Sequence, residues 1–155
     1  MADFGESVKL RIVDARYEFG YLVDTGILLA MADPGDSRHD EATRCMATVS
    51  ARGLPIFVSL PTIYETHRRI LFAVGMRRAR EFLGSIFDGS TLIVAPDLAD
   101  EERAIAWIDR FSDQRLTLTD AVNMVILARM RLSGVMSFDV HFLLGGFLRV
   151  PPVPV

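Results

Sequence analysis

The chain has 155 residues, of which 50% are hydrophobic and 24% charged, with a formal net charge of −3. This composition excludes a disordered chain, and the length fits one domain able to bury a sizeable core. The apolar runs are far shorter than the roughly 20 residues that span a bilayer, so we expect no membrane segment.

The first part of the chain begins with residues 1–19, which carry mixed charge and weak periodicity, and we interpret them as an N-terminal extension. Gly20 to Val23 predicts a short buried strand that ends at Asp24, and a helix is expected over Gly26 to Ala32. A turn cluster at 33–36 follows. Ser37, with Asp40 three residues later, predicts the start of a helix that runs to Arg52 and is ended by Gly53.

The middle of the chain continues the alternation of strands and helices. Pro55 to Ser59 predicts a strand, and a helix is expected from Pro61 through Val74, with Glu65 one turn in. Gly75 separates it from a helix over Met76 to Phe87. A third strand is expected over Thr91 to Ala95.

The last part contains the most apolar predicted helix. Asp97 with Asp100 predicts an amphipathic helix that precedes it. Thr117 or Thr119 can then cap a helix whose first turn carries Asp120 and whose side chains from Ala121 to Leu132 are nearly all apolar, so it should be buried almost all round.

Gly134 is expected to end this helix, as a residue just past a helix often does. Val135 to Phe138 is then an extended run that stops at Asp139. Phe147 to Val150 predicts a final edge strand, and residues 151–155 form a proline-rich tail.

Short apolar strands alternating with helices predict an α/β fold around a mainly parallel sheet. No repeat or long linker divides the chain, so we expect one domain over residues 20–150.

Four acidic residues occupy one kind of position in this pattern. Asp24 and Asp139 end strands, Glu65 follows a strand within the first turns of a helix, and Asp120 opens a helix. In a doubly wound parallel sheet all four positions lie along the carboxyl edge, where ligands bind. Carboxylates gathered there repel one another unless cations lie between them, and oxygen ligands of this kind suit Mg²⁺ or Mn²⁺.

Each of these acids also has a simpler interpretation. Asp24 and Asp139 can be turn residues, Asp120 can favour the helix dipole, and Glu65 can belong to a solvated face. The combination is more specific than any member, because four unrelated turn acids need not fall at one edge of the sheet.

The chain resembles PIN-domain ribonucleases, and most of all the VapC-type toxins of VapBC toxin–antitoxin pairs. The resemblance covers roughly Leu22 to Val150. It rests on four segments, LVDTGILLA at 22–30, SLPTIYE at 59–65, LTLTDA at 116–121 and MSFDVHF at 136–142.

The resemblance implies a three-layer PIN-like fold, with a five-stranded parallel sheet flanked by helices. It also implies a metal-dependent endoribonuclease with Asp24, Glu65, Asp120 and Asp139 as the acids that bind Mg²⁺ or Mn²⁺ for cutting RNA. Thr25 and Ser137 match places where the family often has a small hydroxyl residue. The expected partners are RNA, a cognate antitoxin and a second copy of the chain in a homodimer.

Asn123 lies one turn after Asp120 on the same face of the predicted helix, so we expect it to support the acids from behind. The arginines at 68, 69, 77, 78 and 80 are equally compatible with a solvated face, with RNA phosphates or with an acidic partner. At its spacing from Glu65, His67 points away from that acid, which favours a structural or surface role, and His39 is more simply explained by a loop-to-helix junction.

The single cysteine, Cys45, rules out an internal disulfide and fits packing within a helix in a reducing cytosol. The first residues lack a basic stretch followed by an apolar core, so we expect no signal peptide and a cytoplasmic protein.

Other reaction classes lack their required residues. Phosphoryl transfer through an aspartate needs a lysine late in the chain, and the one lysine is Lys9. Asp24 is followed by Thr25-Gly26 and not by a second aspartate, and the chain contains no P-loop or GxGxxG motif. The alternative that stays open is a non-catalytic PIN-like module that binds protein or RNA.

Overall fold

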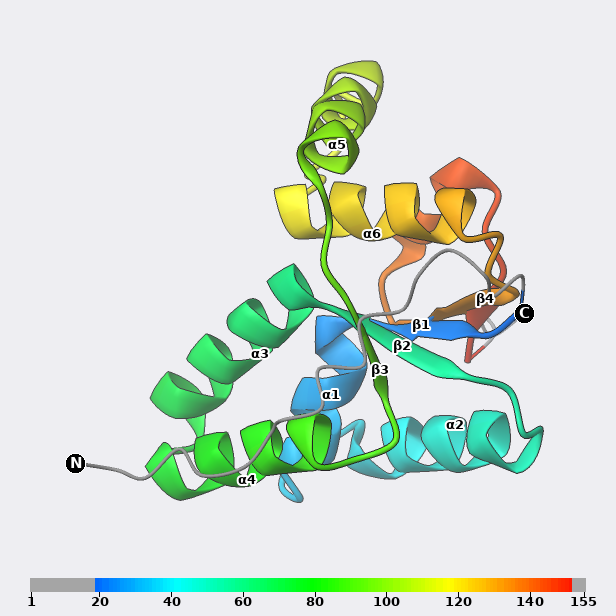
Figure 1. Cartoon of the computed structure of the whole chain (residues 1–155). Coiled ribbons are helices and arrows are strands. Elements are labelled where there is room, and N and C mark those ends of the chain that lie inside the picture. Colours follow the sequence, from blue (N-terminus) through cyan, green and yellow to red (C-terminus); the bar gives the residue numbers. More distant parts are fainter. Residues whose placement is uncertain (1–18, 152–155) are drawn as a thin grey trace.

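A computed structural model describes residues 19–151, which form one five-stranded sheet with helices on both sides (Figure 1). The strands are β1 (Tyr21–Val23), β2 (Ile56–Ser59), β3 (Leu92–Val94), β4 (Gly134–Met136) and β5 (Arg149–Val150). Their order is β3-β2-β1-β4-β5, and every neighbouring pair is parallel. The predicted α/β class is therefore confirmed, whereas the predicted extension and tail lie almost wholly outside the described residues.

Alternating side chains of the strands supply two separate hydrophobic cores. Leu22 is aligned with Phe57 on one side and Val135 on the other, and all three belong to one core. Tyr21 and Val23, which flank Leu22 in β1, belong to the core on the opposite face. A strand's side chains point to opposite faces with period two, so three residues are enough to anchor both layers.

The first four helices cover one face of the sheet and the last two cover the other. The helices are α1 (Thr25–Ala32), α2 (His39–Ala51), α3 (Leu60–Ala73), α4 (Met76–Phe87), α5 (Leu98–Arg110) and α6 (Leu118–Arg129), followed by the 3₁₀ helix η1 (Val140–Gly145). In Figure 1, α5 and α6 lie above the sheet while α2 and α4 lie below it. The core residues divide between the layers in the same way.

Helix α6 is the most buried helix, as its apolar sequence predicts, with every residue from Ala121 to Leu127 buried. The prediction that Gly134 ends it is wrong. The chain leaves the helix earlier, at Arg131 with a φ of 50°, and Gly134 is the first residue of β4. A Cβ at Gly134 would lie 2.6 Å from the carbonyl oxygen of Leu148, so this glycine permits the close approach of β4 to the chain leading into β5.

The predicted cap of α2 is also wrong. The helix begins at His39 without a side-chain cap, because the carboxylate of Asp36 accepts the backbone N–H of Arg38 at 2.7 Å and builds the preceding turn. The predicted caps of the later helices are confirmed. Asp97 with Asp100, and Thr117 with Asp120, form reciprocal capping boxes at the starts of α5 and α6.

The strand order creates a switch point beside β1. The chain passes outward from β1 to β2 and β3, then returns to the other side of β1 to form β4 and β5. The connections that leave β1 and β4 therefore diverge, and a crevice opens between them at the carboxyl edge of the sheet. Asp24 and Asp139 lie at that edge. Among the described residues, no helix has the length and apolar character needed to cross a membrane.

Candidate active site

The four predicted acids, Asp24, Glu65, Asp120 and Asp139, line one pocket of about 470 Å³ at the carboxyl edge of the sheet. They come from four different segments of the chain: the end of β1, helix α3, helix α6 and the connection after β4. The parallel order of the strands brings them together. Thr25, Asp36, Arg38, Arg69 and Thr117 also contribute to the wall of this pocket.

Asp24 is the most buried of the four acids, with 5% of its surface exposed. It precedes the first turn of α1, and its Oδ2 accepts a hydrogen bond from the hydroxyl of Ser137 at 2.6 Å. The pKa of Asp24 is raised to about 7: burial raises it most, the hydrogen bond from Ser137 lowers it, and the nearby charges of Asp120 and Asp139 raise it. Without a cation beside it, ionised Asp24 is therefore costly at neutral pH.

Ser137, one of the two predicted hydroxyl residues, joins two of the acids. Its hydroxyl donates to Asp24 and accepts the backbone N–H of Asp139 at 2.9 Å. Arg149 in β5 donates to the carbonyl oxygen of Ser137 at 2.7 Å and is itself buried. Sequence reasoning missed Arg149, although a lone arginine within an apolar edge strand was an available signal.

Asp139 caps η1 on the far side of Ser137. Its Oδ1 accepts the backbone N–H of His141 at 2.9 Å and lies 2.8 Å from the Nδ1 of the same residue. The carboxylate therefore points back toward its own turn, although its residue lines the pocket.

Asp120 opens α6 and is held by Thr117. Its Oδ2 accepts the hydroxyl of Thr117 at 2.7 Å and the backbone N–H of the same residue at 3.1 Å. Partial burial raises the pKa of Asp120, the two bonds from Thr117 lower it, and the charges of Asp139 and Glu65 raise it again. Asp120 thus belongs to the same electrostatic cluster as Asp24.

Glu65 has 34% of its side chain exposed, and Arg69 lies 3.9 Å from it one turn along α3. Behind it, Asn123 of α6 accepts from the hydroxyl of Ser59 at 2.6 Å and donates to the hydroxyl of Thr62 at 2.9 Å. Asn123 does not line the pocket. These buried bonds fix the start of α3, which carries Glu65, against α6, which carries Asp120.

Most charged residues of the pocket are acidic, but their carboxylates do not converge on a common position. Within residues 19–151, no three His, Cys, Asp or Glu side chains approach closely enough to hold one metal ion. The caps explain this spacing, because Thr117 holds Asp120 and the turn at His141 holds Asp139. The donor set nevertheless fits a hard divalent cation, since all four carboxylates share one pocket, and burial, with a smaller contribution from their mutual repulsion, raises the pKa of two of them.

Thr25, the second predicted hydroxyl residue, is 4% exposed and lines the same pocket. In the described part of the chain its Oγ1 has no hydrogen-bond partner. A buried hydroxyl left in this state normally meets water or a ligand. Its position beside Asp24 therefore gives the pocket an unused donor and acceptor.

Sequence reasoning missed Asp36 and Arg38. Both lie in the turn before α2, where the proline- and glycine-rich sequence indicates only a change of direction. The guanidinium of Arg38 stacks on the ring of Phe138, 4.4 Å from its centroid. Because this contact joins residues 100 positions apart, no local pattern could have predicted it.

The other residues considered in the sequence analysis make contacts that stabilise the fold. His39 Nδ1 lies 2.8 Å from the carbonyl oxygen of Ala30, which ties the start of α2 to α1. Arg77 and Arg78 pair with Glu81 on α4, and Gly75 does interrupt the two helices as predicted. Cys45 is buried in α2, as expected.

Comparison with known proteins shows one curated protein of similar sequence and several solved structures of similar fold. The chain is 24% identical over 118 residues to ribonuclease VapC26 of Mycobacterium tuberculosis strain ATCC 25618 / H37Rv, which covers 76% of this chain and 85% of that protein. Its structure is similar to that of VapC20 of Mycobacterium tuberculosis, described as a sarcin–ricin loop cleaving toxin, with a TM-score of 0.79 and 23% identity over 86% of this chain and 100% of the other.

A more distant similarity is to FitAcB from Neisseria gonorrhoeae, with a TM-score of 0.59 and 12% identity over 83% of this chain and 95% of that one. No protein-family model matches the chain. The predicted resemblance to VapC-type PIN-domain proteins is confirmed, and so is the predicted three-layer PIN-like fold with its five-stranded parallel sheet.

Proposed function

We propose that the chain is a divalent-metal-dependent endoribonuclease that cleaves RNA phosphodiester bonds, and that it is the toxin of a type II toxin–antitoxin pair. One observation carries this proposal. Four acids picked out by their sequence positions line one pocket at the switch point of the sheet, where Asp24 has a pKa of about 7 and Asp120 a raised one. The similarity to proteins named ribonuclease VapC26 and VapC20 toxin supports the same reaction.

Asp24, Glu65, Asp120 and Asp139 would hold the ion, for which Mg²⁺ or Mn²⁺ is the expected kind because all the donors are carboxylate oxygens. When bound, such an ion supplies a water of lowered pKa and neutralises charge on the leaving oxygen of a phosphodiester. A cation would also favour the ionised forms of Asp24 and Asp120, whose pKa values burial and, to a smaller extent, repulsion raise.

The other residues of the site hold these acids in place. Ser137 orients Asp24 and fixes the backbone of Asp139. Thr117 holds Asp120 at the start of α6, where its carboxylate would be one of those that hold the ion. Asn123 maintains the relative position of α3 and α6. Thr25 offers its free hydroxyl to the water or substrate that occupies the pocket.

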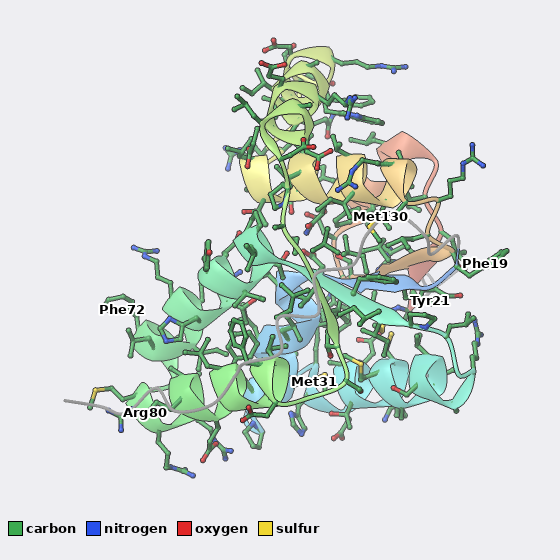
Figure 2. The ribbon with its side chains drawn as sticks, in the orientation of Figure 1. Phe19, Tyr21, Met31, Phe72, Arg80 and Met130 are labelled. Carbon is green, nitrogen blue, oxygen red and sulfur yellow. The ribbon has the colours of Figure 1, made fainter. Side chains whose placement is uncertain are left out.

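We extend the proposal to the setting of the protein. Residues 20–150 would form the nuclease domain, working in the cytoplasm as a homodimer that a cognate antitoxin neutralises. An exposed apolar surface at the junction of α3 and α4 supports a protein partner. Phe72 is 78% exposed there and Met76 68% exposed, and Figure 2 shows Phe72 projecting outward from α3.

The test is cleavage of total tRNA, ribosomal RNA and a short sarcin–ricin loop RNA by purified, antitoxin-free protein, with Mg²⁺, Mn²⁺ or EDTA. Asp24→Asn should lose at least roughly 100-fold in rate, because removal of a metal-binding acid forfeits several kcal/mol of transition-state stabilisation. Asp109→Asn, which neutralises an exposed aspartate on α5 outside the pocket, is the matched control and should cut like the parent chain.

Cleavage that persists equally in Asp24→Asn would refute the proposal, because a contaminating nuclease or a different site would then be responsible. If no RNA is cut, the melting temperature in Mn²⁺ decides between a nuclease of narrow specificity and a non-catalytic binding module. An ion at the pocket should raise the melting temperature in the parent chain and in Asp109→Asn but not in Asp24→Asn. No such rise would favour the binding module.

A further inference from the structure

The pocket that holds the acids also has two positively charged side chains on its wall, from separate elements. Arg38 comes from the turn before α2, and Arg69 comes from α3. Arg38 lies over Phe138, next to Asp139, whereas Arg69 lies beside Glu65. Of the two guanidinium groups, only that of Arg69 is paired with an acid of the pocket.

These two arginines differ in how much of their hydrogen-bonding capacity is already used. Arg69 lies 3.9 Å from the carboxylate of Glu65, which offsets part of its charge. In the part of the chain that the structure describes, the guanidinium of Arg38 has no carboxylate partner and lies against the ring of Phe138. Asp36, two residues earlier, accepts the backbone N–H of Arg38 and is not paired with its side chain.

The stacking on Phe138 restrains the guanidinium without consuming its donors. A guanidinium that lies on an aromatic face keeps its five N–H groups, which lie in its own plane, available at the edge. The backbone N–H of Arg38 donates to the carboxylate of Asp36 at 2.7 Å, which fixes the backbone of Arg38 in the turn. Arg38 is therefore a preorganised planar donor at the wall of a pocket that is otherwise strongly acidic.

A polyanion that enters this pocket needs such a group. The wall carries five carboxylates, from Asp24, Asp36, Glu65, Asp120 and Asp139. RNA approaching them meets repulsion, and a planar guanidinium can bind two oxygens of one phosphate while it offsets that charge. Thr25 adds an unpartnered buried hydroxyl inside the same pocket, which independently indicates that the space receives a ligand.

We propose that Arg38, supported by Phe138, is a substrate-positioning residue that binds an RNA phosphate next to the one being cleaved. This inference rests on the proposed nuclease function and deepens it. Arg38 holds the backbone of the substrate against the acids, on the side of the pocket occupied by Phe138 and Asp139. Arg69, already shared with Glu65, contributes less.

The test compares Arg38→Ala and Arg38→Lys with Arg44→Ala, which removes the same charge from an exposed position on α2 that does not line the pocket. Cleavage of a short RNA should show a KM raised about tenfold in Arg38→Ala, with kcat changed much less, because a charge-assisted hydrogen bond to substrate is lost. Arg38→Lys should recover only part of this loss, since lysine keeps the charge but not the planar fork.

Binding is measured separately in chains that also carry Asp24→Asn, so that the RNA stays intact. Loss of one phosphate contact should reduce the slope of log affinity against log salt by about 0.7 in Arg38→Ala and leave it unchanged in Arg44→Ala. If the parent chain cuts RNA and Arg38→Ala matches Arg44→Ala in both KM and salt slope, the assignment of Arg38 is wrong while the nuclease function stands. If the parent chain neither binds nor cuts RNA, both proposals fail.

Discussion

Asp24 and Asp100 are both buried aspartates at the beginning of a helix, but their surroundings have opposite charge. Asp24 is 5% exposed and Asp100 is fully buried. Asp100 receives Arg129 at 3.0 Å and faces Arg103 at 3.6 Å, and it also closes a capping box with Asp97. Asp24 has one hydroxyl partner, Ser137, and its charged neighbours are other carboxylates.

The difference separates an aspartate that holds the fold together from one that is available for chemistry. The charge of Asp100 is compensated by side chains of the same chain, which links the start of α5 to the end of α6. The charge of Asp24 is not compensated, and its raised pKa shows the cost. A buried carboxylate without a cation of its own is the kind of group that binds an external cation.

The first and largest effect expected is that of Asp100→Ala on stability. Removing this carboxylate takes away the partner of Arg129, whose side chain is 32% exposed, and opens the capping box. The lost charge-assisted hydrogen bonds and helix cap together should lower the free energy of unfolding by about 3–4 kcal/mol. Urea denaturation followed by circular dichroism measures this loss. RNA cleavage per folded molecule should stay close to that of the parent chain, because Asp100 does not line the acid pocket.

A loss of cleavage without a loss of stability in Asp100→Ala would contradict this division of roles. Asp97→Ala is the companion variant, because it opens the same capping box but leaves the pair with Arg129 in place. It should cost about 1 kcal/mol, typical of a lost helix cap. The difference between the two variants then reports the contacts of Asp100 with Arg129 and Arg103 together.

The second prediction is that Asp24→Asn stabilises the metal-free chain in a pH-dependent way. The pKa of Asp24 is raised from 3.8 in the unfolded chain to about 7 in the folded one. The folded state therefore binds a proton more tightly, and its stability falls as the pH rises from about 4 through 7. Above pH 7 the full cost remains, at most about 4 kcal/mol for a shift of this size.

Asp24→Asn lacks this titration, so in EDTA it should be more stable than the parent chain at pH 8 and nearly equal to it at pH 4. Urea denaturation at closely spaced pH values measures the difference. Asp109→Asn, which neutralises an exposed aspartate, should follow the parent chain throughout. A parent chain whose advantage over Asp24→Asn grew with pH would show that Asp24 is compensated after all, like Asp100.

The same contrast explains how much of the molecule the sequence could predict. The order of strands and helices follows from apolar periodicity, and the shared edge of the four acids follows from parallel strands. The capping boxes at Asp97 and Thr117 were predictable because they are local. These features depend on residues close together in the chain, or on a rule that holds for every parallel sheet.

Contacts between distant segments were not predictable. The pairing of Asp100 with Arg129 joins two helices, and the stacking of Arg38 on Phe138 joins two turns that are 100 residues apart in the sequence. The end of α6 was misplaced for a related reason. Gly134 is a typical helix terminator, but β4 needs it for a close approach to Leu148, and Arg131 takes the left-handed position instead.

Among Asp100→Ala, Asp24→Asn and Ser137→Ala, the smallest effect is expected for Ser137→Ala. This variant tests whether the hydroxyl stabilises the ionised form of Asp24 or only fills space. Its hydrogen bond to Asp24 lowers the pKa of that carboxyl, so the bond is stronger to the ionised form. In EDTA the loss of stability should be about 2 kcal/mol at pH 8 and about 1 kcal/mol at pH 5, where Asp24 in the folded chain is mostly protonated.

Ser137→Thr keeps the hydroxyl and should keep the pH dependence of the parent chain. An equal loss at both pH values would mean that Ser137 contributes packing and a bond to Asp139 alone, and that Asp24 has even less compensation than its one short hydrogen bond indicates.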